Sequence, residues 1–271
     1  MNRTSISTAT TTTRAGDDRV AGDGGGVVVS RRLGPGPATV EGLRWLARVG
    51  PAPIDAWGCA MGWVPGTARS HAARLTRVGW VARAAMRHGG GSLLFATRLG
   101  VHVAVVPVPP APEPAPTWWA HLAGCAWVAA WLTARGREML GPRELLVDDS
   151  WRGELNGVST PRRAVHRPDL VGVVPSRRPA AIEVELARKS KARLRAILSL
   201  HARWIATGRS GACVYVCGDE VIRELVISQA GLAGLSLEDR SLRVELLGTV
   251  KELALAASDE AGARTRLAGA T

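Results

Sequence analysis

The sequence predicts an α/β protein, α+β overall, with two domains joined by a proline-rich linker. Residues 38–105 show the order helix, helix, helix, hairpin, and residues 118–256 show the order αβββαβ followed by one more helix and strand. Between them, residues 106–117 are so rich in proline that they are expected to form a semi-stiff linker. Residues 1–37, rich in Thr, Gly and Asp, are expected to be disordered, and residues 257–271 to form a frayed tail.

Composition favours a polyanionic partner. The 271 residues carry a formal net charge of +12, which points to nucleic acid first and an anionic membrane second. Only three of the 35 basic residues are lysine, and the heavy use of Ala, Gly and Arg is typical of a coding bias that explains part of this charge. The four scattered cysteines, with no CxxC pair, indicate neither a cysteine zinc site nor a disulfide framework.

No segment predicts export or membrane insertion. The first residues lack an apolar core segment, so they do not resemble a secretory signal. The most apolar stretch, residues 118–132, is shorter than the roughly 20 residues that a membrane span needs. We therefore expect a cytoplasmic protein with no membrane partner.

In the first domain, helices are expected over residues 39–50, 53–62 and 67–81, because apolar residues recur there at helical spacing. Strands over 81–87 and 92–98 flank a glycine-rich tip, which is typical of a hairpin. The third helix turns Ala68, Ala72, Leu75 and Val78 inward, and its other face carries four polar residues, Arg69, Ser70, Arg74 and Arg77.

This order of elements is that of a winged helix-turn-helix, whose third helix enters the DNA major groove while the hairpin touches backbone or minor groove. Eight arginines oppose two acids in the domain, which makes double-stranded DNA the expected partner. The alternative is a winged helix used for protein contacts, with solvated arginines. The candidate DNA-binding residues are Arg69, Ser70, Arg74 and Arg77 on the third helix, and Arg83, Arg87 and His88 on the hairpin.

In the second domain, turn residues separate short apolar runs from longer helical patterns. Helices are expected over residues 118–135, 189–206 and 220–229, and strands near 144–148 and over 167–174, 181–186, 212–217 and 242–247. Cys213 and Cys217 should share one face of a strand as small buried side chains.

The chemistry-bearing residues gather around residues 167–191. In a strand over 181–186, Glu183 and Glu185 point to the same face. Asp169 begins the preceding strand, and a short turn makes an antiparallel pair in which Asp169 faces Glu183. Clustered carboxylates attract a hard cation, so Asp169, Glu183 and Glu185 are candidate ligands of Mg²⁺ or Mn²⁺. Such an ion lowers the pKa of a bound water and stabilises phosphorane charge.

Lysine is rare in this chain, so its position after the acidic strand is informative. Lys189 follows Glu185 by four residues and can fold back over the carboxylates, where it would assist catalysis, whereas Lys191 is less well aimed. The alternative is that both glutamates lie on the solvent face of an amphipathic strand. His121 is expected to be a satisfied buried side chain. His166 is expected at the surface or in packing, with a phosphate contact as the alternative.

These residues resemble the signature of the PD-(D/E)xK nucleases. Asp169 after Arg167 and Pro168, then Glu183, Glu185 and Lys189, is similar to that signature on an αβββαβ core. The chain departs from it where Glu185 takes the usual place of the lysine, so Lys189 would have to stand in. Glu144 could supply an extra upstream acid.

More narrowly, the chain is similar to the replication-relaxation family of plasmids and integrative mobile elements. The similarity covers residues 39 to about 250 and rests on His121 in an apolar helix, the R-E-L segment, H-R-P-D ending at Asp169, E-V-E-L and the lysine-bearing helix. It implies a DNA-binding role in replication or its control, with Mg²⁺-dependent nicking or cleavage as one hypothesis. The alternative is a non-catalytic regulator whose nuclease-like domain contacts DNA or protein. Replication or mobilisation proteins are further expected partners, and a homodimer is among the open oligomeric states.

Overall fold

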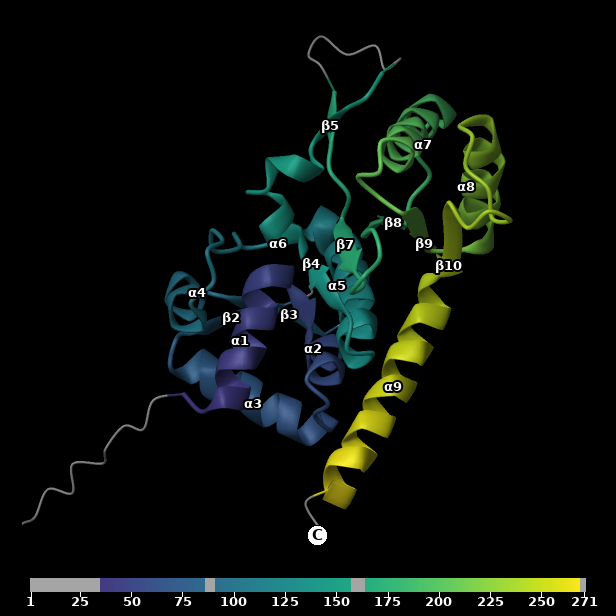
Figure 1. The fold of residues 1–271 in the computed structure, drawn as a ribbon. Helices are drawn as coiled ribbons and strands as arrows, with labels where there is room; N and C mark the ends of the chain where they lie inside the picture. The colour runs from purple at the N-terminus through teal and green to yellow at the C-terminus, as the bar shows by residue number, and fades with distance from the viewer. Residues whose placement is uncertain (1–34, 86–90, 157–163, 269–271) are drawn as a thin grey trace, which may run out of the picture. The chain divides into compact units, whose positions relative to one another are not determined.

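The chain folds as a helical part with a small antiparallel sheet, followed by a layered α/β part (Figure 1). The computed structural model describes residues 35–85, 91–156 and 164–268, and side chains as far as residue 260. The predicted disordered segment 1–37 lies almost wholly outside the described residues, as do the hairpin residues Arg87 and His88. The mixed α/β class predicted from the sequence is confirmed.

The first part has one strand between its first two helices and a hairpin after its third. The small sheet is antiparallel, with β3 between β1 and β2. Helix α3 buries Ala68, Ala72 and Leu75, as its helical spacing predicts, whereas Val78, predicted to point inward, is exposed at the end of the helix. A short helix that the sequence did not predict, α4, follows the hairpin. The elements are α1 (Pro37–Val49), β1 (Ala52–Pro53), α2 (Ile54–Ala60), α3 (Pro65–Arg77), β2 (Val81–Ala85), β3 (Ser92–Ala96) and α4 (Arg98–Ala104).

The second part contains a five-stranded mixed sheet in the order β10-β9-β8-β7-β4. Strands β8, β9 and β10 run parallel, joined by crossover helices, and β4 and β7 are antiparallel to their neighbours. Its elements are η1 (Pro116–Trp118), α5 (Trp119–Ala134), β4 (Glu138–Leu140), α6 (Pro142–Leu145), η2 (Asp149–Trp151), β5 (Gly153–Glu154), β6 (Val165–His166), β7 (Leu170–Val173), β8 (Ala180–Glu185), α7 (Lys191–Ala206), β9 (Ala212–Cys217), α8 (Glu220–Leu232), β10 (Leu242–Leu246) and α9 (Leu247–Ala268).

Helices cover both faces of this sheet. Helices α5 and α9 pack together on the face that carries Ile182 and Val184. Helices α7 and α8 cover the opposite face, which carries Cys213, Tyr215 and Cys217. The prediction that Cys213 and Cys217 share one buried strand face is confirmed. Because side chains alternate along β8, Glu183 and Glu185 lie on the α7 side.

The two parts share a hydrophobic core across the predicted linker. Buried residues of α1, α2 and α3 form one cluster with those of α5 and α9. The proline-rich run lies along the second part: Val108 is buried, and Arg143 Nη2 donates to the carbonyl oxygens of Pro109 and Pro110, each at 2.9 Å. These contacts hold residues 108–110 of the predicted linker against the folded chain.

The predicted strand near residues 144–148 is wrong. Helix α6 occupies its first half, and the edge strand of the sheet is β4 instead. Pro142 takes the first helical position, and the Glu144 carboxylate accepts a hydrogen bond from Gly141 N at 2.8 Å, so this segment starts a helix. Glu144 also pairs with Arg48 at 2.9 Å, so it points to the first part and adds no acid to the predicted metal site.

The chain end also differs from the prediction. Residues 257–268, expected to fray, continue α9, because the sequence from Glu252 is rich in good helix formers and α9 packs against α5. Among the described residues, no helix has the length and apolar character needed to cross a membrane.

Candidate functional site

The β7–β8 pair brings Asp169 next to Glu183. Leu170 pairs with Ile182 in the antiparallel register, so Asp169 comes opposite Glu183, as the sequence predicts. Asp169 N donates to Ile182 O at 3.0 Å, and the Asp169 carboxylate accepts a hydrogen bond from Val184 N at 2.8 Å. The side chain of Asp169 therefore extends the hydrogen bonding between β7 and β8 beyond the first residue of β7, and one of its oxygens is hydrogen-bonded to the backbone of β8.

The second oxygen of Asp169 faces helix α5. It lies 3.1 Å from His121 Nε2, and the Cys125 Sγ atom lies 3.6 Å from the same nitrogen. The hydrogen bond to Asp169 raises the pKa of His121 above its ordinary value, against the opposing effect of burial. His121 thus has a polar partner, as predicted, but its side chain is 30% exposed rather than buried, and its partner is the central acid of the predicted site.

Glu183 is buried between two histidines. Its Oε1 atom lies 2.7 Å from His166 Nε2 and 2.8 Å from His201 Nε2. Burial alone would raise the pKa of Glu183, but the two histidines more than offset this, and the pKa lies well below its ordinary value. Burial opposes the charged form of His166, yet Glu183 raises the pKa of that imidazole overall. The alternative that both glutamates lie on the solvent face of the strand is wrong, because Glu183 is only 4% exposed and Glu185 only 5%.

Glu185 has a different partner, Lys189. The ammonium group contacts Glu185 Oε2, so the lysine folds back over the acidic strand as the four-residue spacing predicts. Burial raises the pKa of Glu185, and Lys189 partly offsets this. Helix α7 begins at Lys191 with Ser190 as its cap, two residues later than predicted, so Lys189 lies in the turn before the helix. Lys191 itself is exposed.

The three carboxylates predicted to hold Mg²⁺ or Mn²⁺ do not gather as one group of donor atoms in the described part of the chain. Among the described residues, two groups of possible metal-ligand atoms lie within 4.8 Å of one another, and neither is the trio Asp169, Glu183 and Glu185. Both groups are rich in nitrogen or sulfur, whereas Mg²⁺ prefers an all-oxygen shell. The groups are His121, Cys125 and Asp169, and His166, Glu183 and His201.

His201 was missed in the sequence because its significance depends on a long-range contact. It follows Leu194, Ile197 and Leu198 at helical spacing, so the sequence placed it on the inward face of the helix that follows the acidic strand. A polar side chain on such a face needs a polar partner. That requirement was the available signal, and Glu183 satisfies it.

Tyr215 was also missed. It lies on β9, directly across from Glu183 of β8, and is fully buried. Its hydroxyl has no hydrogen-bond partner within the part of the chain that the structure describes. Burial, and then the charge of Glu183, raises the pKa of this phenol well above its ordinary value. The phenol therefore stays protonated next to the carboxylate.

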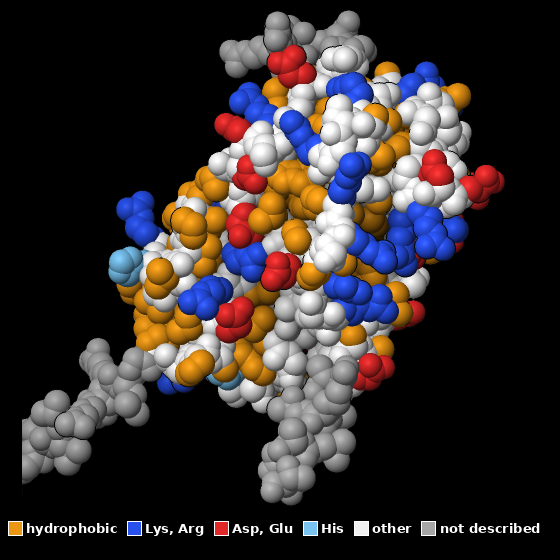
Figure 2. All heavy atoms as spheres, viewed as in Figure 1, with side chains coloured by type: hydrophobic (Ala, Val, Ile, Leu, Met, Phe, Trp, Pro, Cys, Tyr) orange, Lys and Arg blue, Asp and Glu red, His pale blue; other side chains and the backbone are white. Residues whose placement is uncertain are grey.

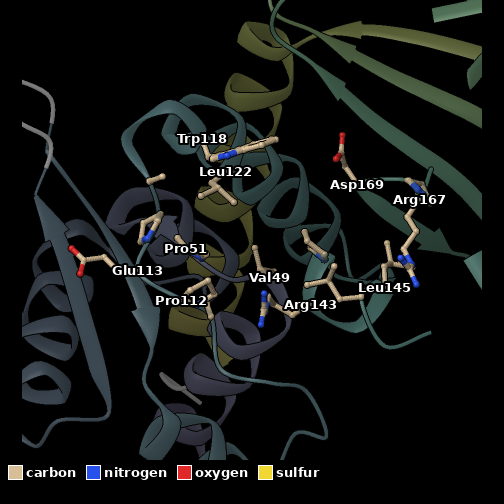
Figure 3. A pocket seen from close by; sticks show the side chains of 16 residues that line it. Val49, Pro51, Pro112, Glu113, Trp118, Leu122, Arg143, Leu145, Arg167 and Asp169 are labelled. Carbon is tan, nitrogen blue, oxygen red and sulfur yellow. The ribbon is translucent and has the colours of Figure 1, made fainter. Parts of the chain in front are cut away.

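A pocket of about 600 Å³ opens beside Asp169 (Figure 3). Trp118 at the end of η1 and Leu122 in the first turn of α5 line it, and the proline-rich run lines it with Pro112. Trp118 is 60% exposed, which gives the pocket a flat apolar wall. Two further lining residues are basic, Arg143 and Arg167; their guanidinium groups are hydrogen-bonded to Pro109 and Pro110 and to Asp149.

The candidate DNA-binding residues lie on the first part. Arg69, Ser70 and Arg77 are exposed on α3, and Arg83 is exposed on β2. The fourth residue of the α3 face, Arg74, is exposed but held, because its Nη2 atom lies 2.7 Å from Thr39 Oγ1 and 3.1 Å from His71 Nδ1. Arg87 and His88 lie outside the described residues.

All four cysteines are expected to resist thiol reagents in the folded protein. Each is free and buried, and burial raises the pKa of Cys59 to about 11, the pKa of Cys217 to about 12, and the pKa values of Cys125 and Cys213 well above the ordinary value. Because the thiolate is the reactive form, an aromatic disulfide reagent at pH 8 should label none of them before unfolding and all four in denaturant. Labelling of the native chain at the rate of a free thiol would contradict this burial.

Compared with models of protein families, with curated proteins and with solved structures, the chain matches none of them.

Proposed function

We propose that the protein binds double-stranded DNA through helix α3 and the β2–β3 hairpin. The observation that carries this proposal is the exposed polar face of α3, which carries Arg69, Ser70 and Arg77. Within the part of the chain that the structure describes, neither arginine forms an ion pair with an acidic side chain. The opposite face of α3 is apolar and buried, so the arginines are fixed on a rigid helix.

The order of elements supports this proposal. Helix, strand, helix, helix and hairpin, with β3 between β1 and β2, is the order of a winged helix. In that fold the third helix lies in the major groove, where arginine can bind the O6 and N7 atoms of guanine. Arg74, held by Thr39 and His71, would keep a fixed position beside the groove.

The net charge of the protein supports the proposal less well than the position of these arginines. On the face shown in Figure 2, Lys and Arg side chains lie among Asp and Glu side chains, with apolar surface between them. The net charge of +12 is therefore not gathered into one basic patch on that face. The position of the arginines on α3 is the stronger argument.

The test compares two variants that lose the same charge. Arg69→Ala with Arg77→Ala removes two arginines from α3, and Arg137→Ala with Arg152→Ala removes two exposed arginines from the second part. If each α3 arginine contributes about 1 kcal/mol or more to binding, the first variant should bind a duplex library about thirtyfold more weakly. Fluorescence anisotropy at fixed salt measures this, and the control should change little. An equal loss of DNA affinity in both variants would contradict the proposal that α3 binds in the DNA groove.

The second part has a non-catalytic role in this proposal. The acids of the predicted site are each committed to protein partners: Asp169 to His121, Glu183 to two histidines, and Glu185 to Lys189. We expect the wild type to bind DNA and not to cut supercoiled, linear or single-stranded DNA with Mg²⁺ or Mn²⁺. Metal-dependent cutting that Asp169→Ala and Glu183→Gln abolish, with binding intact, would establish the nuclease instead. A role in replication or copy control of a mobile element stays a prediction of the sequence resemblance.

A further inference from the structure

We propose that His166, Glu183 and His201 form a binding site for one divalent transition-metal ion, Zn²⁺ foremost. One donor atom from each residue lies within 4.8 Å of the other two. Two imidazole nitrogens and one carboxylate oxygen, with a water in the fourth position, form a known type of zinc site. This site is separate from the DNA-binding face proposed on α3.

The distances suit an exchange of hydrogen bonds for metal bonds. The two imidazole nitrogens already converge on one carboxylate oxygen, at 2.7 and 2.8 Å. Donor atoms about 2.1 Å from a tetrahedral ion lie about 3.4 Å from one another. Separations must therefore grow by several tenths of an ångström, which small rotations of the side chains can supply. The ion would take the place of the imidazole protons that now point at Glu183.

Packing holds the rings in position. The imidazole of His201 meets the ring of Trp204 edge-on at 5.2 Å and the ring of His166 at 5.9 Å between centroids. The three donor residues come from β6, β8 and α7; strand β6 pairs with β5, and residues of β8 and α7 pack in one hydrophobic cluster. A site whose ligands are already oriented loses little entropy when the ion binds.

Exposure gives the site one open side. The side chain of His201 is 1% exposed and that of Glu183 6%, whereas that of His166 is 13% exposed. Water and the ion therefore approach past His166. The attraction between an ionised carboxylate and a cation is stronger in a low-dielectric setting than in water, and it offsets part of the cost of removing both charges from water.

The other group of donors provides an internal comparison. His121, Cys125 and Asp169 also gather, but Val184 N already holds one Asp169 oxygen and the thiol of Cys125 is deeply buried. A zinc-bound cysteine must be a thiolate, which burial disfavours. The two groups can be distinguished by absorption spectroscopy of bound Co²⁺, because only the group with Cys125 contains sulfur.

The experiment uses the full-length chain without a histidine tag, stripped with chelator and titrated with Co²⁺, then with Zn²⁺ in competition. We expect one ion per chain, the visible absorption of Co²⁺ with nitrogen and oxygen ligands, and no sulfur-to-cobalt charge-transfer band. His166→Gln should weaken binding by at least about tenfold, since even the loss of a group behind a ligand costs that much. Cys125→Ser should leave the absorption unchanged.

Three results would overturn the proposal: no stoichiometric Co²⁺ or Zn²⁺, a charge-transfer band that Cys125→Ser removes, or unchanged affinity in His166→Gln. Circular dichroism checks that His166→Gln folds, and the spectrum of the wild type is informative even where a variant does not fold. DNA affinity is measured separately on the same samples, so failure of the metal site and failure of the DNA-binding proposal give different results.

Discussion

Replacing Glu183 by alanine is expected to lower the free energy of unfolding by about 3–5 kcal/mol, the usual cost of removing one partner from a buried ionic group. The carboxylate is the shared acceptor for His166 and His201, and the His201 side chain is only 1% exposed. Without Glu183 both imidazoles lose their acceptor, and a cavity opens under α7. Urea unfolding in the presence of chelator measures the change as a lower midpoint with an unchanged slope.

The matched control is Glu185→Ala, two residues along the same strand face. Glu185 pairs with a single partner, Lys189, whose side chain is 30% exposed. Water can solvate that lysine when the acid is removed, so the loss should be smaller than the loss in Glu183→Ala, whose partner His201 is buried. If the two alanine variants unfold at the same urea concentration, the histidine pair does not anchor Glu183 as described.

Replacing Gly100 by alanine is expected to destabilise the protein by about 3 kcal/mol, the upper range for forcing atoms into a packed site. A methyl group on Gly100 would lie 2.0 Å from the carbonyl oxygen of Trp80, which is backbone and already accepts a hydrogen bond from Thr97 N. Helix α4 would have to move away from Trp80, the residue just before β2. The sign of the change in unfolding free energy is informative, because replacing glycine by alanine inside a helix normally stabilises a protein by about 1 kcal/mol.

Gly231→Ala in α8 is the control for this effect. Nothing lies within 4 Å of the added methyl group there, so this variant should be as stable as the wild type or more stable by several tenths of a kcal/mol. Thermal and urea unfolding of both variants give the comparison. A Gly100→Ala variant as stable as the wild type would show that α4 does not pack so closely on Trp80.

Local patterns in the sequence predicted much of the sheet. Strand β9 has the bounds predicted, Ala212–Cys217, because an apolar run lies there between two glycines. Strand β8 is shifted by one residue, and its alternating side chains placed both glutamates on the same face. The strand near 144–148 failed because Gly141, Pro142 and Glu144 together start a helix, and this capping outweighs the strand character of the residues that follow.

The candidate site was less predictable, because its partners come from distant segments. The pairing of Asp169 with Glu183 follows from a short turn, and the contact of Lys189 with Glu185 follows from a four-residue spacing. The partners His121 and His201 lie 48 residues before Asp169 and 18 residues after Glu183, on helices whose placement depends on the whole core. Nitrogen donors around the acids therefore could not be seen in the acidic strand itself.

Hydrogen exchange of the full-length chain with and without duplex DNA tests the central claim most directly. DNA binding through α3 predicts slower exchange across residues 65–77 and 81–96 at saturating duplex. The effect should weaken with rising salt, as phosphate contacts require. Protection confined to residues 118–268, with α3 unchanged at a DNA concentration that saturates binding, would contradict the claim.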